Sequence, residues 1–285
     1  HKEMAGVYAY LPLGKRVLDK ILQIIREEME ALGGQELLMG SLQNPEVWQK
    51  TGRWDDEVLD VWFKTKLKNE TEIGLATTHE EPLTKLAKQF IHSYKDLPKY
   101  LFQFQTKFRN ELRSKSGILR TREFVMKDLY SFNKDEESLN IFYETAKQAY
   151  FNIFNRLGLG DVTFLTFSSG GAFSKYSHEF QTICEAGEDT IYLDREKGLA
   201  VNEDVYTKEV LEDLGLDEGK LEKVKAEEVG NIFKLKTRFS EPLKLLYTDK
   251  NGEQKPVIMG SYGIGIGRCL GTVVEINSDK NGIIW

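Results

Sequence analysis

The sequence predicts an α+β fold, a mostly antiparallel β-sheet flanked by helices. Apolar residues between positions 15 and 32 recur at helical spacing. Residues 102–111 alternate between apolar and polar side chains, as a strand does, and a second extended segment follows after a short polar loop. A chain of 285 residues can bury a large core and lies near the upper size of a single domain.

The first predicted element is an amphipathic helix over residues 15–32. The residues on its apolar face are Val17, Leu18, Ile21, Ile25, Met29 and Leu32. Gly33 and Gly34 end the helix, because glycine suits the left-handed conformation of a C-terminal cap. We expect a short strand over residues 36–39 to follow.

A second helix is predicted over residues 78–94. Thr78 has the side chain of an N-cap, Glu81 stands where its capping-box partner would be, and Pro82 is tolerated in the first turn. Under this interpretation the carboxylate of Glu81 serves the backbone of the helix and takes no part in binding.

The alternating segment and its return form the predicted hairpin. One side of the first strand is apolar, and its residues are Phe102, Phe104, Thr106 and Phe108. The other side carries Gln103, Gln105, Lys107, Arg109 and Glu111. After a loop with Ser114, Ser116 and Gly117, a common side is expected for Arg120, Arg122, Phe124 and Met126.

This hairpin offers the groups that would bind ATP. Guanidinium groups suit phosphate oxygens, a carboxylate accepts from an exocyclic amine, and a phenyl ring stacks on a base. From Lys107 to Lys127, seven lysines and arginines face only two acids, although the whole chain has a formal charge of −6. The contrast predicts a polyanionic ligand for a local patch and argues against nucleic acid covering the whole surface.

Two later segments, residues 168–189 and 194–227, differ in the structure that their composition predicts. Residues 168–189 indicate a polar loop followed by a half-buried strand, and residues 194–227 form an acidic, helix-prone stretch whose charge run we interpret as a solvated face. No run of 18 apolar residues and no secretory signal is visible, so we expect no membrane segment. Cys184 and Cys269 provide no disulfide framework, which fits a reducing cytoplasm.

Six ordered blocks resemble a known family. Phe108-Arg109-Asn110-Glu111, followed by Arg120, Phe124 and Asp128, resembles motif 2 of the class II aminoacyl-tRNA synthetases. MGSYGIGIGR at 259–268 resembles motif 3; its spacing is not that of the GxGxxG dinucleotide fingerprint. THEE at 78–81, TREFVMKDLYSF at 121–132, SHEF at 177–180 and EVGNIFKL at 228–235 are similar to bacterial prolyl-tRNA synthetases, over residues 6–285.

The resemblance implies the class II catalytic fold and ATP-dependent activation of L-proline, with transfer to tRNA(Pro). It implies that Arg109 and Arg268 are catalytic. It further implies that ATP is bound by Arg109, Glu111, Arg120, Phe124 and Arg268. Magnesium is the implied metal, and its ligands are left open: Glu179 would ligate it or face solvent.

For the amino acid, the resemblance implies contacts from Thr78, Glu80, Arg109 and His178. Two of these have structural alternatives. Glu80 lies in the first turn of a predicted helix, and His178 would buttress the strand that carries it. The loop before that strand reads GGAFSKYSHEF where the family has GGS before SHEF, so its alignment is open by two or three residues.

The resemblance also predicts domain organisation. The 15–32 helix and the strand after it resemble motif 1, which forms the dimer interface in the family, although Gly40 stands where proline is usual. An ordinary surface helix is the alternative. We expect one catalytic domain over 1–285, with the acidic stretch in place of an editing domain, no anticodon-binding domain, no editing in cis and poor tRNA charging.

Two rival hypotheses are less consistent with the residues. A threonyl-type enzyme would need a zinc site with one Cys and two His, and the histidines here are only His1, His79, His92 and His178. A non-catalytic paralogue that regulates or binds nucleic acid would tend to lose the arginines that hold ATP, and Arg109, Arg120 and Arg268 are all present.

Overall fold

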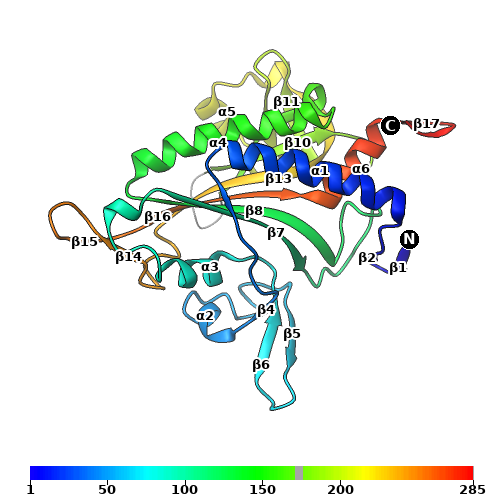
Figure 1. Ribbon diagram of the computed structural model, residues 1–285. Coiled ribbons are helices and arrows are strands. Elements are labelled where there is room, and N and C mark those ends of the chain that lie inside the picture. The colour runs from blue at the N-terminus through cyan, green and yellow to red at the C-terminus, as the bar shows by residue number, and fades with distance from the viewer. Residues whose placement is uncertain (171–175, 285) are drawn as a thin grey trace.

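A nine-stranded β-sheet organises the chain in the computed structural model, which describes residues 1–170 and 176–284 (Figure 1). The strand order is β10-β9-β12-β11-β13-β16-β8-β7-β3. The pairs β12–β9 and β3–β7 are parallel and the other neighbours are antiparallel, so the predicted sheet is confirmed. The strands are β3 Gln35–Glu36, β7 Lys99–Phe108, β8 Glu123–Asn133, β9 Thr163–Ser169, β10 Tyr176–Ile183, β11 Asp189–Asp194, β12 Leu199–Asn202, β13 Glu222–Lys236 and β16 Ile258–Gly265.

Helices cover one face of this sheet. Figure 1 shows α1 (Pro12–Ala31) and α4 (Glu136–Arg156) lying across it, with α6 (Ile266–Ile276) at one end. The largest core cluster lies between these helices and the sheet. The predicted first helix is confirmed and begins three residues earlier than expected, because Pro12 occupies its first turn. The strand expected at 36–39 is shorter and is limited to β3.

A smaller layer packs on the opposite face. It contains α3 (Glu80–Ala87), α2 (Pro45–Gln49) and a three-stranded sheet of β4 (Leu42–Gln43), β6 (Glu72–Leu75) and β5 (Phe63–Lys66). Trp48, Trp54 and Trp62 form the core of this layer. In Figure 1 the β5–β6 hairpin projects away from the main sheet, α2 lies beside this hairpin, and α3 lies nearer the sheet.

The prediction for the second helix is wrong at both ends. The helix α3 begins at Glu80 with His79 in the N-cap position and ends at Ala87, and no side chain caps its start. Thr78 does not cap the helix, because its hydroxyl donates to the carboxylate of Glu80 instead. Glu81 is completely buried and is bound by Arg53, so it is not a capping-box partner.

The acidic stretch also differs from its prediction. Its only α-helix among the described residues is α5 (Lys208–Leu214), and the stretch also contains β12 and the start of β13, which belong to the main sheet. Pairing between strands overrides the helix propensity of the charged residues. Glu227, at the end of this stretch, is buried and not part of a solvated face.

The remaining elements are short. They are β1 Lys2–Met4, β2 Val7–Tyr8, β14 Leu246–Thr248, β15 Gln254–Pro256, β17 Ser278–Asp279, β18 Gly282–Ile283 and the 3₁₀ turns Tyr94–Asp96, Gly160–Val162, Glu203–Val205 and Glu218–Lys220. Within the described part of the chain, none of the helices combines the length and apolar character needed to cross a membrane.

Candidate active site

The hairpin of β7 and β8 directs one row of side chains toward α3. Its register pairs Lys107 with Phe124, Gln105 with Met126 and Gln103 with Asp128. Residues that are paired across antiparallel strands share a face, so these side chains form one surface. Phe102 and Phe104 point the other way, into the core under α1 and α4. The alternation that the sequence predicts for this segment is confirmed.

A narrow cavity of about 60 Å³ lies at the end of the hairpin. We call it cavity A. It brings together every residue for which the resemblance implies ATP binding: Arg109, Glu111, Arg120, Phe124 and Arg268 line it. Gly263, Gly265 and Gly267 also line it, so backbone forms part of its wall.

Arg109 and Phe124 are in direct contact within cavity A. The guanidinium carbon of Arg109 lies 5.3 Å from the centre of the Phe124 ring, a cation–π geometry. Burial, together with the neighbouring Arg268, lowers the pKa of Arg109, although a guanidinium stays charged in proteins. Two cations held close together in a buried place favour an anionic ligand.

The other two guanidiniums of cavity A are paired with carboxylates. Arg120 donates to Glu111 at 2.7 Å and to Glu188 at 2.8 Å, and these bonds raise its pKa. Arg268, in the first turn of α6, donates from Nη1 to the carboxylate of Glu228 at 2.9 Å. A triphosphate entering cavity A would compete with these carboxylates for the guanidinium donors.

Arg122 does not share this surface, contrary to the prediction. Its guanidinium donates to the backbone carbonyls of Glu111 and Ala5. The residue precedes the first paired residue of β8, so the period of two does not govern its direction. Arg122 fixes the backbone at Glu111 and does not line cavity A.

A second cavity, of about 360 Å³, lies between the hairpin and α3. We call it cavity B. Thr78, Glu80 and Arg109 line it, three of the four residues for which the resemblance implies proline binding. Arg109 and Glu111 line both cavities, so they stand where the two meet. Of its charged lining residues, four are carboxylates and two are guanidiniums, which suits a cationic group on the ligand.

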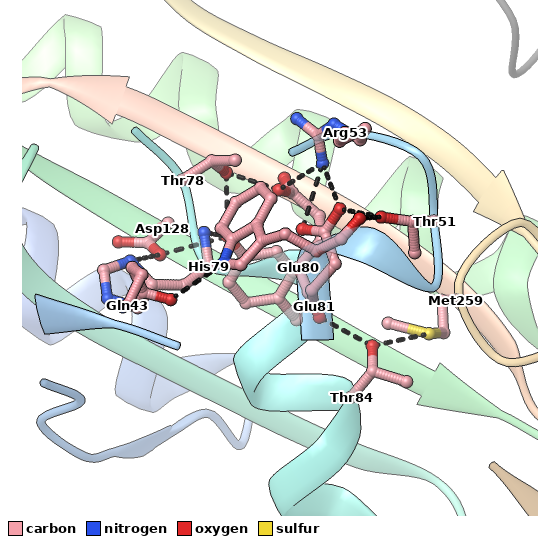
Figure 2. Close-up of polar contacts among 12 residues, drawn as sticks. Gln43, Thr51, Arg53, Thr78, His79, Glu80, Glu81, Thr84, Asp128 and Met259 are labelled. Atoms are coloured by element: carbon pink, nitrogen blue, oxygen red, sulfur yellow. Dashed lines mark hydrogen bonds and ion pairs between the residues drawn. The ribbon is translucent and has the colours of Figure 1, made fainter. Parts of the chain in front are cut away.

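A network of polar contacts fixes the α3 side of cavity B (Figure 2). Thr78 Oγ1 donates to Glu80 Oε2 at 2.5 Å. Arg53, from the loop after α2, lies 3.4 Å from the same oxygen and binds the buried Glu81 as well. Glu80 is therefore oriented from two sides, by a hydroxyl and by a guanidinium.

His178 and Glu179 lie on opposite faces of β10. His178 pairs with Ile232 of the α4-side core and its Nδ1 lies 2.8 Å from Tyr143 Oη of α4. Burial and Lys147 lower its pKa to about 4. The structure does not bring His178 to either cavity. Glu179 faces the other way and accepts from Gln181 and Asn202 rather than facing solvent.

Several lining residues have no role in the sequence-based prediction. They are Arg53, Asp60, Asp128, Tyr130 and Asn231. Arg53 and Asp60 come from an irregular loop, where no periodicity relates a residue to a face. Asp128 and Asn231 stand in blocks quoted for the resemblance, and the period of two along β8 places Asp128 beside Met126.

The sequence matches the family model described as tRNA synthetase class II core domain (G, H, P, S and T) over residues 63–277. It is 38% identical to a proline–tRNA ligase of Caulobacter sp. (strain K31), covering 100% of this chain and 68% of that protein. A proline–tRNA ligase of Agrobacterium fabrum is 37% identical, and the match covers 100% of this chain and 70% of that protein. The chain belongs to the proline–tRNA ligase family.

Solved structures support the fold of this family member. A prolyl-tRNA synthetase of Giardia lamblia in complex with prolyl-adenylate superposes with a TM-score of 0.79 at 18% identity, over 99% of this chain and 50% of that one. A prolyl-tRNA synthetase of Cryptosporidium parvum complexed with L-proline and AMP superposes with a TM-score of 0.76 at 13% sequence identity. The match covers 100% of this chain and 50% of that one. The chain therefore spans about half the length of these structures.

Proposed function

We propose that this chain activates L-proline with ATP to prolyl-adenylate and, within the whole protein, transfers the prolyl group to tRNA(Pro). The position of Arg109 supports this proposal most directly. It lies where cavity A, lined by three guanidiniums and a phenyl ring, meets cavity B, which contains Glu80. A cation at this junction neutralises the charge that passes from one substrate to the other.

In the first step the carboxylate of proline attacks the α-phosphorus of ATP in line and pyrophosphate leaves. In the second, the terminal ribose hydroxyl of the tRNA attacks the acyl carbonyl and AMP leaves. Neither step needs a protein nucleophile, so catalysis comes from positioning and from charge neutralisation. Arg109 would bridge the carboxylate and the α-phosphate, and Arg268 would bind the γ-phosphate.

For the nucleotide, we propose that Phe124 stacks on the adenine and that Glu111 accepts from its exocyclic amine. Arg120 would bind the triphosphate. Arg109 occupies the face of Phe124, and Arg120 is bound to Glu111. ATP binding would then move Arg109 off the ring and transfer Arg120 from carboxylates to phosphates.

For proline, we propose that Glu80 accepts from the ring ammonium and that Thr78 orients this carboxylate. The short contact between the two side chains supports the division of roles. His178 is left out of this proposed site because it contacts Tyr143 on the opposite face of the sheet.

Magnesium would enter with ATP. In the described residues, no three His, Cys, Asp or Glu side chains form a group that would hold a metal ion alone. Magnesium in such enzymes is bound by substrate phosphates and one or two carboxylates. Glu228, which is bound to Arg268, fits that partial role.

Three further features belong to the proposal. The exposed Leu38, which follows β3, supports a dimer formed through the motif 1-like segment, and sedimentation of a Leu38→Lys variant as a monomer would test it. The unpaired Cys184 and Cys269 support a cytoplasmic location. Residues 194–227 are too few for an independent core, and they contribute β12 and the start of β13 to the main sheet, so we expect no editing. Deacylation of alanyl-tRNA above background would contradict this.

The proposed activity is tested by ATP–pyrophosphate exchange with a panel of amino acids. Proline should support exchange at low concentration, and threonine, serine and glycine should not. Arg109→Ala should lose about a hundredfold or more of the rate, since one charged donor to a transition state contributes about 3 to 4 kcal/mol. Exchange that does not depend on proline, or that survives Arg109→Ala, would exclude the proposed reaction.

A further inference from the structure

One carboxylate oxygen of Asp128 lies buried beside cavity B without a hydrogen-bond partner in the described structure. Asp128 lines this cavity and is 2% exposed. Within residues 1–170 and 176–284, its Oδ1 has no hydrogen-bond partner. A buried acceptor without a partner loses the free energy of its lost hydration, so such atoms are rare in folded proteins unless a ligand or water binds them.

The other oxygen of the same carboxylate is held firmly. Asp128 Oδ2 accepts from Gln103 Nε2 at 2.9 Å, from Lys107 Nζ at 2.9 Å and from Tyr130 Oη at 3.1 Å. Lys107 is itself completely buried and contacts His79. Three donors on one oxygen fix the rotation of the carboxylate, which leaves Oδ1 as its only free acceptor in the described structure.

Short contacts connect this carboxylate to Glu80. Tyr130 Oη lies 3.1 Å from Asp128 Oδ2 and 3.5 Å from Thr78 Oγ1, which donates to Glu80 Oε2 at 2.5 Å. Thr78, Glu80, Asp128 and Tyr130 all line cavity B. The two carboxylates therefore lie on one continuous polar wall of the same cavity.

We propose that Asp128 Oδ1 accepts the second N–H of the ring ammonium of proline, while Glu80 accepts the first. This inference rests on the proposed function and adds a residue that determines substrate specificity. A secondary ammonium has two donors, and each then meets a carboxylate oxygen. Lys107 neutralises Asp128 from behind, so the carboxylate is stable in its buried place before substrate arrives.

The test compares two ligands on two proteins by calorimetric titration. Proline carries the ring ammonium, and tetrahydro-2-furoate has a ring oxygen in its place and no N–H. Asp128→Asn should lower the affinity for proline about ten- to hundredfold, the usual range for the loss of a hydrogen bond to a charged group. The affinity for tetrahydro-2-furoate should change less than about threefold, because that ligand has no donor to lose.

Gln103→Met is the matched control. The substitution removes one hydrogen-bond donor to Asp128 Oδ2 and leaves the charge on Asp128. Gln103 itself does not line cavity B. Its effect should be small and equal for both ligands. An equal loss for both ligands in Asp128→Asn would reduce Asp128 to a structural role, and unchanged proline affinity would mean that Oδ1 binds only water. Either result overturns the inference.

A ligand series on the wild-type chain covers the case in which Asp128→Asn does not fold. N-methylproline keeps one N–H of the ammonium, so it must bind at least about tenfold more weakly than proline, and equal affinity would contradict the inference. The proposed function fails separately: it is wrong if the wild-type chain shows no proline-dependent exchange, whatever the Asp128 variants do.

Discussion

Arg53 Nη1 donates to both carboxylate oxygens of Glu81, at 3.0 and 3.1 Å. Glu81 is completely buried, and burial raises the pKa of its carboxyl, an effect that Arg53 opposes. Arg53 comes from the loop after α2 and Glu81 from α3, so this ion pair connects the loop over cavity B to the helix that carries Glu80.

Arg53→Met should destabilise the protein by about 3 to 5 kcal/mol, because it leaves the Glu81 carboxylate buried without its cation. Urea unfolding measures this loss. In ATP–pyrophosphate exchange the KM for proline should rise, since Glu80 loses the guanidinium beside it. The KM for ATP should stay within about twofold, because Arg53 does not line cavity A.

The double variant Arg53→Met with Glu81→Gln is the control. Removing both charges should recover at least half of the lost stability, since a neutral pair leaves no buried charge unpaired. A loss below about 1 kcal/mol in Arg53→Met, the range of a surface pair, would show that this contact is weak.

Phe124→Leu should raise the KM for ATP about tenfold, because stacking of a base on an aromatic ring contributes about 1–3 kcal/mol. The KM for proline should change little, since Phe124 does not line cavity B. Phe104→Leu is the matched control. Phe104 lies on the preceding strand and faces the α1–α4 core, so its substitution should lower stability without changing the KM for ATP. If the two substitutions raised the KM for ATP equally, stacking of Phe124 on the adenine would be excluded.

The residues that the sequence located best lie on the β7–β8 hairpin. A strand places every second residue on one face, so the pattern alone places Gln105 with Lys107 and Phe124 with Met126. The register of the two strands, which the structure adds, sets Lys107 opposite Phe124 and Gln105 opposite Met126. The same rule shows where the prediction for β10 fails. His178 and Glu179 are neighbours on opposite faces of β10, because one step along a strand reverses the face, and His178 lies on the α4 side.

Tertiary contacts explain the other errors. Thr78 has the side chain of an N-cap, but its hydroxyl donates to Glu80, so α3 starts later. Arg53 gives no signal in the sequence, because its role depends on a loop meeting a helix distant in the chain. Residues 222–226 belong to a charged, helix-prone stretch, yet they pair with β11 as part of β13.

Gly263→Ala should lower kcat/KM for ATP about tenfold. A Cβ at Gly263 would lie 2.9 Å from Asn231 Oδ1, closer than packed atoms approach. Asn231 donates to Glu228 at 2.7 Å, and Glu228 binds Arg268, so displacing the amide disturbs the guanidinium of cavity A. Exchange kinetics against ATP concentration measure the effect.

Gly14→Ala provides the comparison for this substitution. Gly14 lies in α1, and the nearest atom to its added Cβ is a ring carbon of Tyr10 at 3.9 Å. Alanine there should keep full activity and add about 0.5–1 kcal/mol of stability, because glycine weakens a helix interior. Normal ATP kinetics in Gly263→Ala would show that the wall of cavity A adjusts to a methyl group.

His178→Gln should flatten the acid limb of the stability curve. Burial and Lys147 lower the pKa of His178 to about 4, whereas a histidine in the unfolded chain titrates near its ordinary value of 6.5. Below that value the unfolded chain binds a proton that the native protein excludes, so stability falls as the pH drops from 6.5 toward 4. The full effect is about 3 kcal/mol, at roughly 1.36 kcal/mol for each pKa unit.

Urea unfolding of both proteins from pH 7.5 to 4.5 isolates this effect, because the other titrating groups are common to both. The wild-type chain should be the more stable at pH 7.5, where His178 keeps its contact with Tyr143, and its advantage should shrink as the pH falls. Parallel curves would mean that His178 is not held neutral. Proline KM should not change, because a histidine on the α4 face does not reach cavity B, and a rise of about tenfold would return His178 to the substrate site.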